Sequence, residues 1–290
     1  MDAPNKIEEL SRNLRAGVHV DTRSIYDATL DHPLDDEDNL LEFGLLMADA
    51  AELLRTDLVE YLLNAGCELG VPIFEGAING AIDQKSTAVF DLLLKYHEKW
   101  GINQPCMPTG LPILGHAVTD SDLTDWCFSQ GADPNIMNNK DYTPFSLAVE
   151  YAPIAVINKF LDNGGDVNQG WLLHHAVLRN IQEEGEQDVD VIELLFNNYL
   201  DSGCLDMVMS SRNERFNDPR FGFGTPLHYA AKEKKERLVR YLLELGAKPT
   251  VVDSSGHVAE HWANGHRAIV SLLQSHVPTR NDSVYSTYTA

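Results

Sequence analysis

Apolar residues recur along this 290-residue chain at the spacing of short amphipathic helices. One stripe, with apolar residues at offsets of one, four and five, occurs at 58–63, 156–161 and 238–243. These offsets place the apolar side chains on one face of a helix. Each stripe is followed by a glycine, the residue favoured just beyond a helix C-terminus. The pattern predicts a series of helices that each bury one face.

Two short peptides recur around these helices. Gly-Ala-Asp-Pro-Asn at 131–135 returns in altered form as Gly-Gly-Asp-Val-Asn at 164–168. Further upstream in each unit lies a second element, clearest as Thr-Pro-Leu-His-Tyr-Ala-Ala at 225–231 and weaker at 143–148, 71–77 and 171–176. Proline at the first position of a helix costs no hydrogen bond. Each unit is therefore predicted as a turn, a short helix, a tight connection, a second helix and a loop.

These motifs resemble the ankyrin repeat, whose period is about 33 residues and whose signature is Thr-Pro-Leu-His-x-Ala. The spacing of the two Gly-x-Asp-x-Asn peptides matches that period. The resemblance is closest at 224–250 and nearly as close at 142–168. Further units are expected at 45–69, 71–104, 110–137, 171–204 and 256–276, and residues 6–21 are interpreted as the second helix and loop of a degenerate first repeat.

The resemblance implies an all-α fold, an α-solenoid of stacked helix-turn-helix repeats with short β-turn fingers. About seven or eight units would form a single solenoid over residues 1–276, because each repeat buries its apolar face only on its neighbours. We expect residues 277–290, rich in Ser, Thr and Tyr, to be a disordered tail.

Three segments depart from the repeat. The segments 22–40 and 180–190 are acidic and are expected to be solvated loops. A calcium site in 22–40 is disfavoured because the segment lacks the spacing of an EF-hand loop.

The third departure, 201–223, is longer and carries Arg212, Arg215, Phe216, Arg220, Phe221 and Phe223. Arginine and aromatic residues are enriched at binding hot spots, and long loops are often functional. We expect this segment to contact a partner or ligand. The alternative is that the phenylalanines only pin the loop onto the stack.

Charge is unevenly distributed. The chain has 22 basic and 44 acidic residues, a net charge of −22. Residues 205–240 contain eight basic and five acidic residues, a net charge of +3, so the remainder carries −25. An acidic surface repels phosphates, which argues against nucleic acid or an acidic membrane as partner and favours a protein with a basic surface.

Other features bear on the compartment. The 43% hydrophobic residues suffice for a core, but no apolar run approaches the ~20 residues that span a bilayer. The N-terminal residues lack the apolar core of a signal peptide. Four scattered cysteines form no CxxC pair, which favours reduced thiols. We expect a cytoplasmic or nuclear protein.

The histidines are candidates for a structural or a catalytic role. The resemblance implies that His228, in Thr-Pro-Leu-His, ties neighbouring turns together by hydrogen bonds. His174 occupies the same slot, but Trp171 replaces the threonine, so its network is expected to be incomplete. His175 follows on the face expected to line the concave side. Histidine beside carboxylates can act as a general base near neutral pH. The candidate catalytic residues are His174, His175, Glu150, Tyr151 and Tyr229.

Two functions remain open at this point. The leading hypothesis is a protein-binding scaffold whose concave face and fingers grip a partner. Its candidate binding residues are Trp171, His175, Arg179, Tyr229, Lys232 and Glu233, together with the arginines and phenylalanines of 201–223. The alternative is a cofactor-free acid-base enzyme of cyclase or isomerase type, or a binder of a small hydrophobic ligand, that uses the concave groove.

No metal or cofactor is expected. His257 and His261 are spaced by four, but no carboxylate or cysteine completes a ligand set at motif spacing. Phosphate-loop and dinucleotide motifs do not occur.

Overall fold

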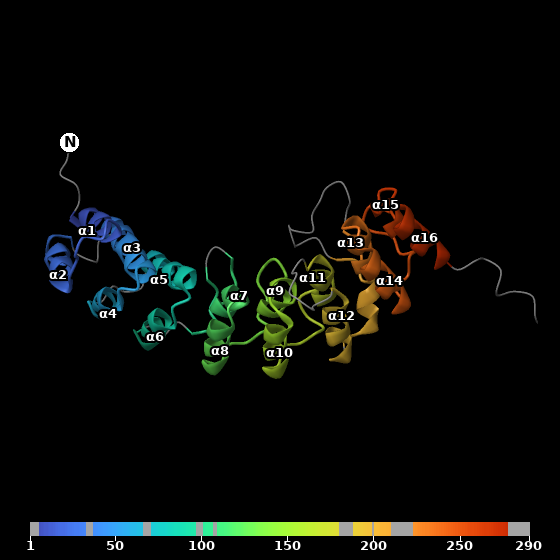
Figure 1. The fold of residues 1–290 in the computed structure, drawn as a ribbon. Helices are drawn as coiled ribbons and strands as arrows, with labels where there is room; N and C mark the ends of the chain where they lie inside the picture. Colours follow the sequence, from blue (N-terminus) through green and yellow to red (C-terminus); the bar gives the residue numbers. More distant parts are fainter. Residues whose placement is uncertain are drawn as a thin grey trace, which may run out of the picture. The chain divides into compact units, whose positions relative to one another are not determined.

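The secondary structure is helical, as expected. The computed structural model describes residues 6–32, 37–65, 71–96, 101–106, 109–179, 188–198, 200–209 and 223–277. These described residues contain sixteen α-helices, one 3-10 helix and two isolated β-bridges, without a named strand (Figure 1). The all-α class is therefore confirmed. Within the described residues, no helix is long and apolar enough to cross a bilayer.

The chain divides into two compact units, residues 1–138 and 139–290. The helices of the first unit are α1 (Lys6–Arg15), α2 (Thr22–Asp31), α3 (Glu37–Glu52), α4 (Thr56–Asn64), α5 (Val71–Gln84), α6 (Thr87–Tyr96), α7 (Ile113–Ala117) and α8 (Ser121–Ser129). Consecutive helices form pairs. The first helices of successive pairs contact one another, α1 with α3 and α3 with α5, as do the second helices, α2 with α4 and α4 with α6. This is the packing of stacked two-helix repeats.

The N-terminal pair corrects two expectations. Helix α1 is the first helix of its pair and not the second, because it packs on α3, whereas α2 packs on α4. The segment 22–40 is not a loop insertion, since α2 occupies its first ten residues and α3 begins at Glu37. The Asp21 side chain accepts a hydrogen bond from the Ser24 N–H at 2.8 Å and caps α2, whose Ile25 and Ala28 are buried. Residues 33–36 lie outside the described residues.

Helices α3 and α5 approach each other closely. They have 16 and 14 residues, compared with eight in α9 (Pro144–Tyr151) of the second unit. A Cβ atom at Gly76 would lie 2.5 Å from the Gly44 carbonyl oxygen, and one at Gly80 would lie 2.7 Å from the Ala48 oxygen. Glycine at these two positions of α5 is what allows the backbones to meet.

The second unit has the same two-row packing. Its helices are α9, α10 (Ile154–Asp162), α11 (Leu172–Leu178), α12 (Asp188–Asn197), α13 (Pro226–Lys232), α14 (Glu236–Glu244), α15 (Ala259–Trp262) and α16 (Arg267–Ser275), with the 3-10 helix η1 (Ser202–Asp206). Helix α11 contacts α9 and α13, and α13 contacts α15, while α14 contacts α12 and α16. The Phe145 and Phe160 rings stack 5.7 Å apart in the core of the first pair, α9 and α10.

The other expected insertions are described only in part. Residues 180–187 lie outside the described residues, and α12 begins at Asp188, so the last three residues of the expected loop 180–190 are helical. Of the segment 201–223, residues 201–209 and Phe223 are described. Its flanks are joined by a backbone hydrogen bond from the Met209 N–H to the Gly224 carbonyl at 3.2 Å, and the second flank is tied to the next repeat by a bond from the Ser254 N–H to the Phe223 carbonyl at 2.9 Å. Of the expected tail, only residue 277 is described, and a single solenoid over 1–276 stays a prediction.

Candidate binding site

His228 ties two neighbouring turns, as the motif implied. Its Nδ1 accepts the Thr225 backbone N–H at 3.1 Å, so the ring proton sits on Nε2, which lies 3.0 Å from the His257 carbonyl oxygen and donates to it. Burial lowers the pKa of His228, which favours this neutral form. The structural role predicted for His228 is confirmed.

His174 makes the same kind of connection between repeats as His228. Its Nε2 lies 3.3 Å from the carbonyl oxygen of Gly224, which stands one repeat before the His257 carbonyl used by His228. The residue before α11, Trp171, adopts a left-handed backbone (φ 58°, ψ 36°) and makes no side-chain cap hydrogen bond. Burial lowers the pKa of His174 to about 3, against the opposing effect of its bond to Gly224. His174 is therefore neutral near pH 7 and acts as a structural donor.

His175 and Glu150 form a buried pair. The His175 Nδ1 atom lies 2.7 Å from Glu150 Oε2, with the two side chains at most 1% exposed. The ring of Tyr142 lies against the imidazole, with centroids 5.3 Å apart. The contact joins the last turn of α9 to the middle of α11.

Arg179 is buried beside this pair. Its Nη1 atom donates to the carbonyl oxygens of Val149 and Ala152, at 3.1 and 2.5 Å. A cation at these carbonyls, which end α9, is favoured by the helix dipole. The Lys235 ammonium in turn donates to the Arg179 carbonyl. Arg179, one of the expected partner contacts, thus fastens α9, α11 and the start of α14 to one another.

An aromatic row crosses the first helices of three consecutive pairs. Trp171 contacts His174, His174 contacts Tyr229, and Tyr229 contacts Trp262, with ring centroids 5.5, 5.9 and 5.3 Å apart and near-perpendicular planes. Edge-to-face packing of this kind is favourable between aromatic rings. Burial raises the pKa of Tyr229 to about 12. Trp262 also donates its indole N–H to Asp253 at 2.8 Å.

Accessibility separates the candidates into two groups. The side chains proposed for acid-base chemistry are at most 3% exposed at four of five positions, namely Glu150, His174, His175 and Tyr229. Tyr151, the fifth, is 38% exposed. Glu233 is exposed, and Trp171, Lys232 and Phe223 are half-buried. The remaining expected contacts lie outside the described residues: Arg212, Arg215, Phe216, Arg220 and Phe221.

The paired histidines of the last repeat lie side by side. The rings of His257 and His261 stack with centroids 4.0 Å apart. Within the described part of the chain, no group of three or more His, Cys, Asp or Glu side chains is arranged to hold a metal ion.

Comparison with known proteins identifies the repeat. Residues 173–282 match the family model of ankyrin repeats, in three copies. This segment of the chain is therefore made of ankyrin repeats. A FYVE zinc finger domain protein, UPA1 of Mycosarcoma maydis, is 30% identical to it over 167 residues, which make up 55% of this chain and 12% of that protein. The chain thus spans about an eighth of the length of this relative.

The three ankyrin repeats of the matched segment correspond to the pairs α11–α12, α13–α14 and α15–α16. Ankyrin repeats are generally protein–protein interaction modules and are typically not enzymes. The sequence motif located His228 and His174, but it gave no sign of the Asp253–Trp262 bond or of the Arg179 contacts. Those contacts depend on which neighbour each side chain meets, and the spacing of residues along one repeat does not encode that.

Proposed function

We propose that this chain is a scaffold that binds another protein through the accessible residues at the start of α11 and the end of α13, together with the segment 201–223. The observation that carries the proposal is the division of the candidates by accessibility. Glu150, His174, His175 and Tyr229 are enclosed in the stack, while Trp171, Lys232 and Glu233 reach the solvent. A partner that covers the surface needs accessible contact residues and places no demand on buried ones.

Charge indicates the chemistry of the partner. The chain carries −22 overall, and complementary potentials steer association. A partner with a basic surface fits this charge. Because exposed charges are screened over a Debye length of about 8–10 Å, binding should weaken as salt is raised.

Specificity is assigned to the arginines and phenylalanines of 201–223. Arg215 and Phe221 lie outside the described residues, so their role rests on the sequence, in which three arginines and three phenylalanines stand close together between Arg212 and Phe223. Arginine provides directional donors and phenylalanine a large apolar area, a combination frequent at hot spots.

The test is affinity capture from the native organism, followed by quantification of the captured proteins by mass spectrometry. Two variants remove proposed contact residues. One is Trp171→Asn, in which asparagine tolerates the left-handed backbone, and the other combines Arg215→Ala with Phe221→Ala. Either should reduce capture of the partner at least tenfold while the far-UV circular dichroism stays unchanged. Raising the salt from 50 to 300 mM should release the same partner from the wild-type protein.

The matched control reverses an exposed ion pair on α14. Glu236 and Arg240 lie 3.3 Å apart, so exchanging them as Glu236→Arg with Arg240→Glu keeps both the pair and the net charge. The control should capture as much partner as the wild type. Equal capture by the wild type, Trp171→Asn and the double variant would refute the proposed surface.

A further inference from the structure

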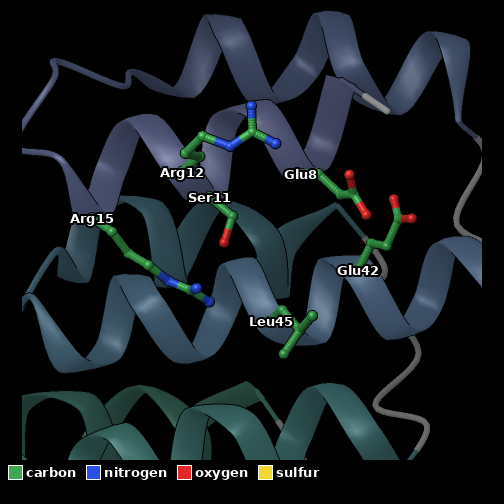
Figure 2. A pocket seen from close by; sticks show the side chains of 6 residues that line it. All are labelled: Glu8, Ser11, Arg12, Arg15, Glu42 and Leu45. Carbon is green, nitrogen blue, oxygen red and sulfur yellow. The ribbon is translucent and has the colours of Figure 1, made fainter. Parts of the chain in front are cut away.

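A pocket of about 340 Å³ lies between α1 and α3, the first helices of the first two pairs. Its lining comes from α1, with Glu8, Ser11, Arg12 and Arg15, and from α3, with Glu42 and Leu45 (Figure 2). The volume falls in the range of ligand-binding pockets, about 300–1,000 Å³. None of these residues belongs to the segment matched by the ankyrin-repeat model.

The charges in the pocket are separated by sign. Figure 2 shows the guanidinium group of Arg15 toward one end, the carboxylates of Glu8 and Glu42 toward the other, and the guanidinium group of Arg12 between them. A ligand of a single charge would meet attraction at one end and repulsion at the other. The arrangement therefore fits a ligand that carries both signs.

The basic end is held by a buried carboxylate. Asp49 is buried and lies 2.7 Å from the Nε of Arg15, and it also accepts a hydrogen bond from the Ser11 hydroxyl. This contact uses the inner nitrogen of Arg15, whose guanidinium group carries five N–H donors in all. Arg15 is thus anchored while most of its side chain stays exposed.

Two exposed leucines stand on α3, and one of them, Leu45, lines the pocket. Leu41 and Leu45 stand one turn apart on α3 and are 58% and 50% exposed. The opposite side of α3 is already buried, with Phe43, Leu46 and Met47 in the core. Adjacent exposed leucines rimmed by charges are characteristic of a contact surface.

We propose that this pocket binds a peptide segment of another protein that presents an acidic, an apolar and a basic side chain in succession along one face. The acidic side chain pairs with Arg12 and Arg15, the apolar one covers Leu41 and Leu45, and the basic one pairs with Glu8 and Glu42. The site goes beyond the function proposed above, because it is formed entirely by the first unit. It would be a second attachment point on the same chain.

Three short fluorescein-labelled helical peptides test the ligand chemistry by fluorescence anisotropy on the full chain. One carries Asp, Leu and Lys along one face, the second has Asp in place of Lys, and the third has Lys in place of Asp. The mixed peptide should bind at least tenfold more tightly than either single-charge peptide. No binding of the mixed peptide at millimolar protein, or equal binding of all three, would overturn the proposal.

Variants of the protein locate the site. Arg12→Glu and Leu45→Ser should each lower the affinity for the mixed peptide at least tenfold. Arg12→Glu should also bind the third peptide, which carries Lys in place of Asp, more tightly than the wild type does. A general loss of structure could not produce that gain. Matched controls on α2 are Arg23→Glu and Leu30→Ser, at side chains that are also exposed, and these should leave every affinity unchanged.

The two proposals can fail separately. Trp171→Asn, which tests the surface of the second unit, should bind the mixed peptide with wild-type affinity. If Trp171→Asn lowers the affinity for that peptide as much as Leu45→Ser does, the peptide does not occupy the α1–α3 pocket and this inference is wrong.

Discussion

The Nδ1 atom of His175 lies 2.7 Å from Oε2 of Glu150, and the stack excludes both side chains from water. A buried pair of this kind contributes little when compared with an apolar replacement, but the loss of one partner is costly because the other remains buried. The contact therefore matters more for holding α9 against α11 in one arrangement than for net stability.

A double-mutant cycle measures this coupling. Glu150→Gln, His175→Gln and the double variant should give a coupling energy of about 1.5–3 kcal/mol in urea unfolding, the range for hydrogen bonds to charged groups. Glu233→Gln, at an exposed position, should change the free energy of unfolding by no more than about 0.5 kcal/mol. Additive effects of the two buried substitutions would show that the contact between His175 and Glu150 has no energetic significance.

The glycines of α5 should resist replacement. Alanine in a helix interior normally stabilises relative to glycine by about 1 kcal/mol, but at Gly76 or Gly80 its Cβ would collide with the α3 backbone. We expect Gly76→Ala and Gly80→Ala each to lower the free energy of unfolding by about 1–3 kcal/mol, as overpacked cores do. Asn79→Ala, at an exposed position of the same helix, should instead raise it by about 0.5 kcal/mol. The measurement is chemical denaturation of the three variants, and a gain in stability at Gly76 would contradict the close approach.

His174 should make the fold sensitive to acid. Its pKa falls from 6.5 to about 3 in the folded protein, mainly through burial, so the unfolded chain binds a proton that the folded chain does not. Stability is therefore complete above pH 6.5 and is lost as the pH falls from there toward 3. As the pH falls from 7 to 5, this histidine alone should lower the free energy of unfolding by about 2 kcal/mol.

The matched variant is His174→Gln, which retains an N–H donor for the Gly224 carbonyl and does not titrate. Urea unfolding of both proteins at pH 7 and pH 5 gives the difference. The wild type should lose about 2 kcal/mol more than the variant over this interval. His228, whose pKa is also lowered, contributes to both proteins and cancels. An equal loss in both would mean that His174 is protonated in the folded state.

Cys127 should be unreactive until the protein unfolds. Burial, and secondarily the neighbouring Cys106, raises the pKa of its thiol from 9.0 to about 12. The thiolate is the nucleophile, and its fraction near pH 8 falls about a thousandfold with such a shift. Iodoacetamide at pH 8 followed by peptide mass spectrometry should label the partly exposed Cys204 in the native protein, but Cys106 and Cys127 only in urea. Native labelling of Cys127 at the rate of Cys204 would rule out this enclosure.

The sequence predicted best where a motif specifies a local geometry. Thr225 and His228 stand three positions apart, so the cap that they form could be foreseen. The resemblance also implied that His228 bonds a neighbouring turn, and the structure identifies the acceptor as the His257 carbonyl. The helix α2 was missed because the apolar side chains it buries are few, mainly Ile25 and Ala28, and a strongly acidic run follows it.

The candidate site was less accessible to prediction. His175 and Glu150 were correctly associated with each other, but their burial was not foreseen, because a helix pattern indicates which face is apolar and not how far a neighbouring repeat covers it. The pocket at Arg12 and Leu45 was missed for a related reason. With α1 assigned to the second position of a repeat, these two residues had no reason to meet.

The joined flanks of the segment 201–223 have a practical consequence. Met209 and Phe223 are the described residues on either side of residues 210–222, and the Met209 N–H bonds the Gly224 carbonyl. Doubling the length of a loop between fixed ends costs only about 0.6 kcal/mol. A small fluorescent domain whose own termini lie close together could therefore be inserted between these residues and report on binding at the surface beside it, while the hydrogen bonds on either side remain intact.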